Sequence, residues 1–447
     1  MRLDWRAVTE AYLDELSEFL RIPSISADPS RAADVRRAGE WVCDRIRAAG
    51  GEAELVDWNG QPLAVGEIPA STRADAPTVL CYGHFDVQPP APLELWESPP
   101  FEPEVRGEWL FGRGVVDDKG QLYMLLKAAE LLASAGELPV NVRFYCDGEE
   151  ETGGHSVVEL LEHEERSADA SVIFDAGMLE RDVPAFFVAT RGLAYFHVRV
   201  RTGEGDLHSG MFGGAALNAV HALMQALEGV LPQDGRVPEP LRAGVAPLTE
   251  EERAEWRALR PGEVELQEAG ARPTDERAAE EFYLRTWAEP SVDVNGMTGG
   301  EPILQKTVLP VTAEANVSIR LAPGQKVAEI EPVFARLLRD AAPADAEVEI
   351  EHQSGADPGV VMPDAPAIEL AQDAFERVLG KRPLLVRSGG TLPIVPALVE
   401  KDVPTIVTGF GLPASNIHAP NERLLYEYLP KGIETAKELF RSLAELR

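Results

Sequence analysis

The sequence is short of cysteines, short of basic residues, and without any long uninterrupted apolar run. Its 447 residues include only three cysteines, Cys43, Cys81 and Cys146, which share no paired spacing. A disulfide framework and a thiolate metal site are therefore not expected. Because Cys81 and Cys146 lie within apolar runs, we predict buried free thiols and a reducing, cytoplasmic location.

The charge balance excludes two classes of partner. Forty-two Lys and Arg oppose 75 Asp and Glu, which gives a formal net charge of −33 at pH 7. Such a surface repels nucleic acids and anionic membranes, so we expect neither as a partner. Charged residues interrupt every apolar run, so no membrane span is expected. Residues 1–20 also lack the basic and apolar regions of a signal peptide.

The outer parts of the chain alternate between strand and helix patterns. Short apolar runs predict buried strands at 78–82, 140–146, 171–174 and 404–408. Helical spacing of apolar residues predicts helices at 31–49, 121–132, 367–379 and 430–446. This alternation is typical of an α/β domain with a mainly parallel sheet.

The middle of the chain has a different pattern. Alternation of apolar and polar residues predicts strands at 195–201, 312–321 and 346–352, with helices at 217–231 and 327–338 between them. This order predicts an α+β (ferredoxin-like) module inserted into the α/β domain.

We therefore predict two domains. The α/β domain comprises residues 1–192 and 358–447, and the inserted domain comprises residues 193–357. Within the inserted domain, residues 232–290 are rich first in Pro and then in Glu and Arg. We expect this insertion to be partly helical and anchored by its aromatic residues, Trp256, Phe282, Tyr283 and Trp287.

Histidines and acids follow each predicted strand of the α/β domain. His84 and Asp86 follow the first strand, Glu149, Glu150 and Glu151 the second, Asp175 the third, and His418 the loop after the fourth. In an open parallel sheet, the carboxyl ends of the strands line the crevice where ligands bind. We therefore expect these side chains to gather at one edge of the sheet.

Asp117 and Asp118 precede a predicted helix, and their role is open. One aspartate could cap the helix, but a cap needs only one, so a cap and a metal site remain alternatives here. Nitrogen and oxygen ligands suit Zn, Mn, Co or Fe. Two metals that share a carboxylate would neutralise the acidic cluster, activate water and polarise a carbonyl, with one Glu left as the general base.

Several motifs, in this order, resemble the M20 family of metallopeptidases. They are YGHFDVQP at 82–89, LFGRGVVDDKG at 110–120, the glutamate triplet with Thr-Gly-Gly, LHSG at 207–210 and SGGT at 388–391. The resemblance covers nearly the whole chain and favours the dipeptidase branch, akin to carnosine and Cys-Gly dipeptidases. Asp rather than Glu at position 175, with Gln88 and Pro89, supports that branch.

The resemblance implies two divalent metal ions, with Zn preferred and Mn or Co as alternatives. His84 and Asp175 would bind one metal, Glu151 and His418 the other, and Asp117 would bridge them beside a cis peptide to Asp118. Asp86 would tune His84. Alignment of Thr152 and Gly153 with the family makes Glu150 the general base and leaves Glu149 without a role.

The resemblance also makes the inserted domain a lid that forms a homodimer. His208 would stabilise the oxyanion, although an ordinary surface histidine beside Asp206 is the alternative. Arg320 would bind the substrate carboxylate, with an ordinary sheet arginine as the alternative. Thr307, Gly390 and Thr391 would contact the substrate.

The predicted activity is hydrolysis of dipeptides, in which a water bridging the two metals attacks the scissile carbonyl and Glu150 takes its proton. One alternative is an N-acyl-amino-acid deacylase of the same family. Another is a binding protein without catalytic activity on the peptidase fold.

Overall fold

The chain separates into two compact units in a computed structural model that describes residues 5–58, 61–257 and 259–446. The first, the α/β unit, comprises Met1–Val188, Val361–Val386 and Pro393–Arg447. The second, the α+β unit, comprises Ala189–Val360 and Arg387–Leu392. Residues 387–392 differ from the prediction, which placed them in the α/β domain. Residues 1–4, part of the stretch compared with a signal peptide, lie outside the described residues.

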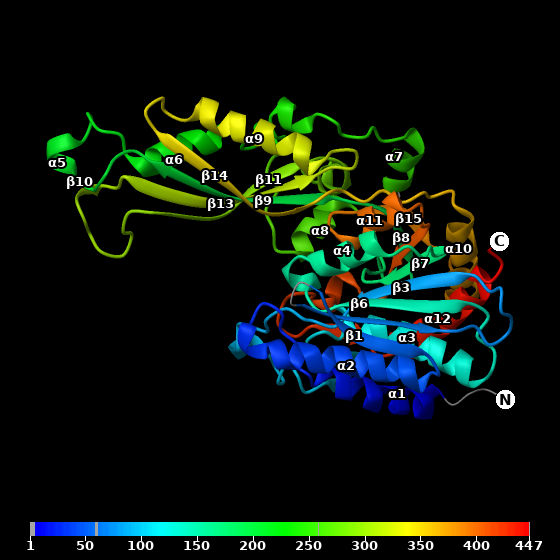
Figure 1. The fold of residues 1–447 in the computed structure, drawn as a ribbon. Helices are drawn as coiled ribbons and strands as arrows, with labels where there is room; N and C mark the ends of the chain where they lie inside the picture. The colour runs from blue at the N-terminus through cyan, green and yellow to red at the C-terminus, as the bar shows by residue number, and fades with distance from the viewer. Residues whose placement is uncertain (1–4, 59–60, 258, 447) are drawn as a thin grey trace. The chain divides into compact units, whose positions relative to one another are not determined.

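A six-stranded sheet forms the centre of the α/β unit, in the order β1-β2-β6-β3-β7-β16 (Figure 1). The strands are β1 (Glu52–Trp58), β2 (Gln61–Ile68), β3 (Thr78–His84), β6 (Asn141–Asp147), β7 (Ala170–Phe174) and β16 (Thr405–Thr408). The pairs β6-β3, β3-β7 and β7-β16 are parallel, while β1-β2 and β2-β6 are antiparallel. The predicted α/β class is confirmed, and the antiparallel edge is an addition to it.

Helices cover both faces of this sheet. They are α1 (Trp5–Leu20), α2 (Ala32–Ala48), α3 (Lys119–Ser134), α4 (His155–His163), α10 (Pro366–Leu379), α11 (Ile394–Glu400) and α12 (Tyr428–Leu443). Helices α2, α3, α10 and α12 share one apolar core with the strands, and α4 and α11 contact β6 and β16. Helix α3 is buried on nearly all sides, which explains its apolar sequence.

A small sheet in the α/β unit brings two distant segments together. Strands β4 (Glu104–Arg106), β5 (Trp109–Phe111) and β17 (Arg423–Leu425) pair in the order β17-β5-β4. In the antiparallel β5-β17 pair, Phe111 lies opposite Arg423. The loop after β5 and the loop before β17 are therefore neighbours. Strands β8 (Ala185–Thr190) and β15 (Leu384–Ser388) form a separate two-stranded sheet.

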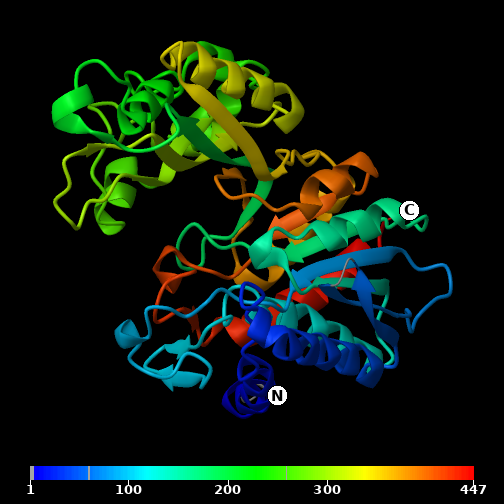
Figure 2. The same cartoon turned by 60° about the vertical axis from the view of Figure 1, so that its left-hand side comes forward.

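The α+β unit has an antiparallel sheet in the order β11-β13-β9-β14 (Figure 2). Its strands are β9 (Gly192–Arg201), β11 (Ser291–Gly299), β13 (Thr312–Leu321) and β14 (Glu347–Ala356). Helices α6 (Ala219–Glu228) and α9 (Val327–Ala341) pack on the sheet through the inward-facing apolar residues of its strands. Shorter elements are β10 (Leu207–His208), α5 (Ser209–Phe212) and β12 (Val308–Leu309).

The insertion of the α+β unit is ordered by its aromatic residues. It contains η4 (Glu239–Arg242), α7 (Glu250–Trp256), α8 (Gly262–Glu268) and η5 (Leu284–Ala288). The ring centroid of Trp287 lies 5.3 Å from that of Trp256 and 4.4 Å from that of Tyr283. The insertion is thus partly helical, as predicted.

Two further sequence predictions concern cysteines and the membrane. All three cysteines are free and buried, as predicted for Cys81 and Cys146 from their apolar surroundings. Among the described residues, no helix combines the length and the apolar character that crossing a membrane requires.

Candidate metal centre

The strands of the α/β unit bring the predicted ligands to one edge of the sheet. In the parallel pair β3-β6, His84 lies directly opposite Asp147, so both strands end at the same level. Asp175 follows the last residue of β7, and His418 lies in the loop that follows β16. His418 itself has a φ of 60°. A non-glycine residue adopts this left-handed region at an energetic cost, so the surrounding loop must hold it there.

Two groups of ligand atoms form around a shared carboxylate. In the first, His84 Nε2 lies 3.0 Å from Asp117 Oδ1 and 3.8 Å from Asp175 Oδ1. In the second, His418 Nε2 lies 2.8 Å from Asp117 Oδ2 and 3.2 Å from Glu151 Oε2. Within each group, the candidate ligand atoms lie within 4.8 Å of one another. Asp117 therefore directs one oxygen toward each histidine, which is the arrangement that a bridging ligand requires.

Neither Asp117 nor Asp118 caps helix α3 with its side chain. Asp118 occupies the cap position but makes no side-chain bond to the helix. Its Oδ2 instead accepts a hydrogen bond from the backbone N–H of His84, at 3.2 Å. The peptide between the two aspartates is cis. Of the two alternatives that the sequence left open for this pair, the helix cap is therefore excluded.

The electrostatics of the cluster favour positive charge. Burial opposes protonation of His84, but hydrogen bonds to Asp117, Asp175 and Asp86 still raise its pKa well above the ordinary value. Hydrogen bonds to Asp117 and Glu151 raise the pKa of His418 to about 10. Burial raises the pKa of Asp175 to about 6. The carboxylates around both imidazoles thus favour positive charge at this site.

The donor set fits divalent cations. Two imidazoles and three carboxylates, those of Asp117, Glu151 and Asp175, supply nitrogen and oxygen ligands without any thiolate. Such ligands suit Zn, Mn or Co. Three negative charges in buried or half-buried positions repel one another, and two divalent cations would neutralise them and replace the imidazole protons.

Asp86 supports both halves of the centre. Its fully buried carboxylate lies 3.3 Å from His84 Nδ1, so it can orient the imidazole. The same carboxylate accepts hydrogen bonds from the backbone N–H groups of Glu150 and Glu151, at 3.2 and 3.1 Å. Asp86 therefore fixes His84 relative to the turn that carries the two glutamates.

The three glutamates have different environments. Glu149 Oε1 accepts a hydrogen bond of 2.7 Å from the backbone N–H of Ser156, in the first turn of helix α4. Glu151 faces His418. Burial, together with the charges of Asp175, Asp117 and Asp86, raises the pKa of Glu150 well above its ordinary value. Cations at the centre would oppose this shift and favour the carboxylate form that accepts a proton.

Comparisons with known proteins test the family resemblance. Residues 80–442 match the family described as peptidase family M20/M25/M40. The chain belongs to this family. The resemblance inferred from the motifs is therefore confirmed.

Similar M20 proteins match nearly the whole chain. A beta-Ala-His dipeptidase of Homo sapiens is 29% identical and covers 98% of this chain and 91% of its own length. A cysteinylglycine-S-conjugate dipeptidase of Corynebacterium striatum is 30% identical, covering 92% of this chain and 91% of itself. The crystal structure of human carnosine dipeptidase 1 has a TM-score of 0.84 at 26% identity, covering 98% and 97% of the two chains.

One further similar structure is named as a carboxypeptidase and not as a dipeptidase. The structure of an M20 family metallo-carboxypeptidase of Sulfolobus solfataricus has a TM-score of 0.87 at 26% identity, covering 97% of this chain and 99% of that one. The predicted M20 architecture of an α/β domain with an inserted α+β domain is confirmed.

The remaining predicted residues lie in the α+β unit of this M20 chain. Arg320 Nη1 donates a hydrogen bond of 3.0 Å to Thr391 Oγ1, although 71 residues separate them. Thr391 Oγ1 donates to the carbonyl of Arg191 at 2.7 Å, and the Arg191 N–H donates to the carbonyl of Gly390 at 3.1 Å. The predicted binders Arg320, Gly390 and Thr391 thus form one cluster within this unit.

His208 and Thr307 form a second cluster in the same unit. His208 is exposed on β10, which pairs with β12, and its Nδ1 accepts a hydrogen bond of 3.1 Å from the Gly210 N–H. The carbonyl of Thr307 accepts hydrogen bonds from Ser209 N and Oγ, at 3.0 and 2.8 Å. Among the residues that the structure describes, none forms a hydrogen bond with His208 Nε2, which leaves this nitrogen for another partner.

Sequence reasoning assigned no contact to Gln88. Its backbone N–H donates to Glu151 Oε1 at 3.1 Å, and its Nε2 donates to Glu151 Oε2 at 2.8 Å. Gln88 therefore orients a predicted metal ligand of the M20 site. The only sequence signal was its place four residues after His84, within the motif at 82–89.

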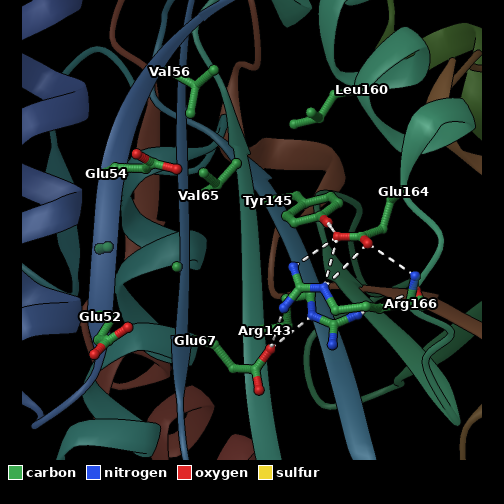
Figure 3. Close-up of a pocket in the computed structure, with 12 residues that line it drawn as sticks. Glu52, Glu54, Val56, Val65, Glu67, Arg143, Tyr145, Leu160, Glu164 and Arg166 are labelled. Carbon is green, nitrogen blue, oxygen red and sulfur yellow. Dashed lines mark hydrogen bonds and ion pairs between the residues drawn. The ribbon is translucent and has the colours of Figure 1, made fainter.

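A hollow of about 610 Å³ lies elsewhere on the α/β unit (Figure 3). It is lined by residues of β1, β2, β6 and the end of α4, and it contains none of the predicted site residues. Both arginines of the hollow already pair with glutamates that also line it. Arg143 Nε bonds Glu67 Oε2 at 2.9 Å, and Arg166 Nη2 bonds Glu164 Oε2 at 2.7 Å. We therefore do not assign the M20 chemistry to this hollow.

Proposed function

We propose that this M20 peptidase hydrolyses the peptide bond of dipeptides at a centre of two divalent metal ions. The observation that carries the proposal is the position of Asp117, whose two oxygens face two separate histidine and carboxylate groups. Relatives named as dipeptidases, which match more than nine-tenths of the chain, support the choice of substrate.

His84, Asp117 and Asp175 would hold one metal, and Asp117, Glu151 and His418 the other. We propose Zn as the natural metal, with Mn or Co as alternatives; nitrogen and oxygen ligands suit all three. Two such ions, when bound, activate a water molecule and polarise the scissile carbonyl.

Glu150 is the proposed general base. It takes a proton from the attacking water and returns it to the leaving amine. Asp86 accepts hydrogen bonds from the backbone N–H groups of both Glu150 and Glu151, so the two glutamates are held on one turn. Because Glu149 is bonded to helix α4, it is the neighbour least suited to this role.

The α+β unit is the proposed substrate-binding lid and dimerisation domain. Arg320 would bind the substrate carboxylate as a planar two-pronged donor, next to Thr391 and Gly390. Thr307 would contact the substrate, and His208 would stabilise the oxyanion through its available Nε2. A homodimer would cover the exposed apolar side chains of this unit, which include Met211, Met297 and Ile303 at 75%, 55% and 88% exposure.

We also propose a cytoplasmic location. The three free, buried thiols are compatible with a reducing compartment. Nucleic acids and membranes are not proposed as partners, since the formal net charge is −33.

The test is release of free amino acids from unblocked dipeptides, with Zn, Mn or Co added and with a chelator control. N-acetyl and N-succinyl amino acids and N-blocked dipeptides form parallel arms. Metal-dependent cleavage of free dipeptides is the expected result. Cleavage of acylated amino acids alone would indicate a deacylase, and cleavage of N-blocked dipeptides a carboxypeptidase. If the protein binds no metal, the remaining hypothesis is a binding protein without catalytic activity.

A further inference from the structure

The central ligand of the proposed centre lies on an irregular segment. Strand β5 ends at Phe111 and helix α3 begins at Lys119, so Asp117 lies in a loop between them. The regular backbone bonds of a helix or strand therefore do not hold it in place. A ligand that must face two metals needs other contacts to fix its position.

One buried carboxylate supplies those contacts. Glu422 is fully buried, and its Oε2 accepts hydrogen bonds from Arg113 Nη1 at 2.7 Å and from the Gly114 N–H at 2.9 Å. Its Oε1 accepts from the Val116 N–H at 2.9 Å and from the Asp117 N–H at 3.2 Å. Three backbone amides of the loop, including that of Asp117 itself, are therefore held by Glu422.

Glu422 also belongs to the segment that carries His418. It lies four residues after His418 and directly before β17, the partner of β5. The Gly112 N–H donates to the Glu422 carbonyl at 3.1 Å, and Arg113 Nη2 donates to the Ala419 carbonyl at 3.4 Å. Backbone and side-chain bonds therefore join the Asp117 loop to the His418 loop.

We propose that Glu422 is a positioning residue of the metal centre, which sets Asp117 and His418 in mutual register. The inference rests on the proposed function, because it assumes that these two residues bind metal. Both oxygens of Glu422 accept two hydrogen bonds each, so a neutral amide of the same shape cannot replace the carboxylate. In Glu422→Gln, the NH₂ group would face two donors, and Arg113 would lose its buried counter-charge.

The test compares Glu422→Gln with Glu15→Gln. Glu15, on α1, also accepts several side-chain bonds, from Tyr123 Oη at 2.7 Å, Lys127 Nζ at 2.5 Å and Arg45. None of these partners is a predicted metal ligand. The affinity of each folded variant for Zn and for Mn is measured by chelator competition, and kcat and KM for a dipeptide are measured at low and at saturating metal.

We expect Glu422→Gln to bind both metals about 10- to 100-fold more weakly than the wild type. Its kcat at low metal should fall with little change in KM, and saturating metal should restore most of it. Glu15→Gln should lower the melting temperature but leave metal affinity unchanged. A contribution to folding alone would lower the melting temperature of both variants and the metal affinity of neither.

Wild-type metal affinity in folded Glu422→Gln would overturn the inference. If that variant does not fold, amide hydrogen exchange in the wild-type protein tests whether Glu422 holds the backbone of the Asp117 loop. The amides of Gly114, Val116 and Asp117 should exchange slowly with and without added metal, and fast exchange would overturn the inference. A wild-type protein that binds two metals without cleaving dipeptides would refute the proposed function, while the affinity comparison would still test Glu422.

Discussion

Changing Asp117 to Asn and changing Asp175 to Asn should have different effects on metal binding. Asp117 faces both histidines, with oxygens 3.0 Å from His84 Nε2 and 2.8 Å from His418 Nε2. Asp175 belongs only to the His84 group. Asp117→Asn should therefore weaken both metal sites, whereas Asp175→Asn should weaken one.

The magnitude follows from the charge that is lost. Two unit charges about 4 Å apart interact by about 4 kcal/mol at the effective dielectric constant typical of proteins, and a divalent cation doubles this to about 8 kcal/mol. The cost of burying the carboxylate offsets part of this attraction. If only about 2 kcal/mol remains for each site, the affinity still falls roughly 30-fold.

Calorimetric titration of metal-free protein with Zn measures the number of sites and the affinity of each. Two sites are expected in the wild type, two weakened sites in Asp117→Asn, and one intact site in Asp175→Asn. Asp57→Asn, which changes an exposed aspartate paired with Arg36, serves as the control for lost charge and should match the wild type. Two sites of wild-type affinity in Asp117→Asn would refute the bridging role, as would equal loss of both sites in Asp175→Asn.

Three further predictions concern the base, the substrate and pH. Glu150→Gln should lower kcat about 10²- to 10⁴-fold with two metals still bound, while Glu149→Gln should retain most activity; the reverse order would refute the assignment of the base. Arg320→Met should lower kcat/KM for free dipeptides about 10- to 100-fold but leave kcat/KM for C-terminally amidated dipeptides unchanged. The control Arg199→Met, on the same sheet, should leave kcat/KM for both substrates unchanged. Equal losses on both substrates in Arg320→Met would argue against carboxylate binding. Because the pKa of His418 is raised to about 10, a metal ion must displace the proton of this imidazole at neutral pH. The apparent affinity for metal should therefore fall as the pH is lowered from about 8 to about 6, and calorimetry should detect the released protons. An affinity for metal that does not depend on pH would contradict this linkage.

The residues that sequence alone could place are those tied to strand ends. His84, Glu151 and Asp175 follow apolar runs that the chain uses as parallel strands, and parallel strands end at one edge of a sheet. Their convergence was therefore predictable from the order of runs and acids. Whether Asp117 caps a helix or faces the histidines was not predictable from the sequence, because it depends on the direction of its side chain.

Glu422 and the segment Arg387–Leu392 gave no comparable signal in the sequence. Glu422 is a single acid in an irregular segment, and its role depends on the pairing of β5 with β17, which joins residues more than 300 positions apart. The segment Arg387–Leu392 was predicted in the α/β domain by chain order, but Arg387 Nη2 bonds Glu252 at 2.6 Å within the α+β unit. Contacts at this sequence separation have no local periodicity that a pattern could reveal.

The antiparallel edge of the central sheet was also missed. Strands β1 and β2 form a hairpin in which Glu52, Glu54 and Asp57 are exposed, so no continuous apolar run marks β1. Edge strands of this kind combine charged residues with half-buried ones, and their pattern resembles that of a loop.

A titration of metal-free enzyme with Zn, followed by the initial rate of dipeptide hydrolysis, tests the central claim most directly. If Asp117 joins two metals in one catalytic centre, the rate should rise and then level off at about two Zn ions per chain. A plateau at one ion per chain, or no hydrolysis at any metal loading, would contradict the account.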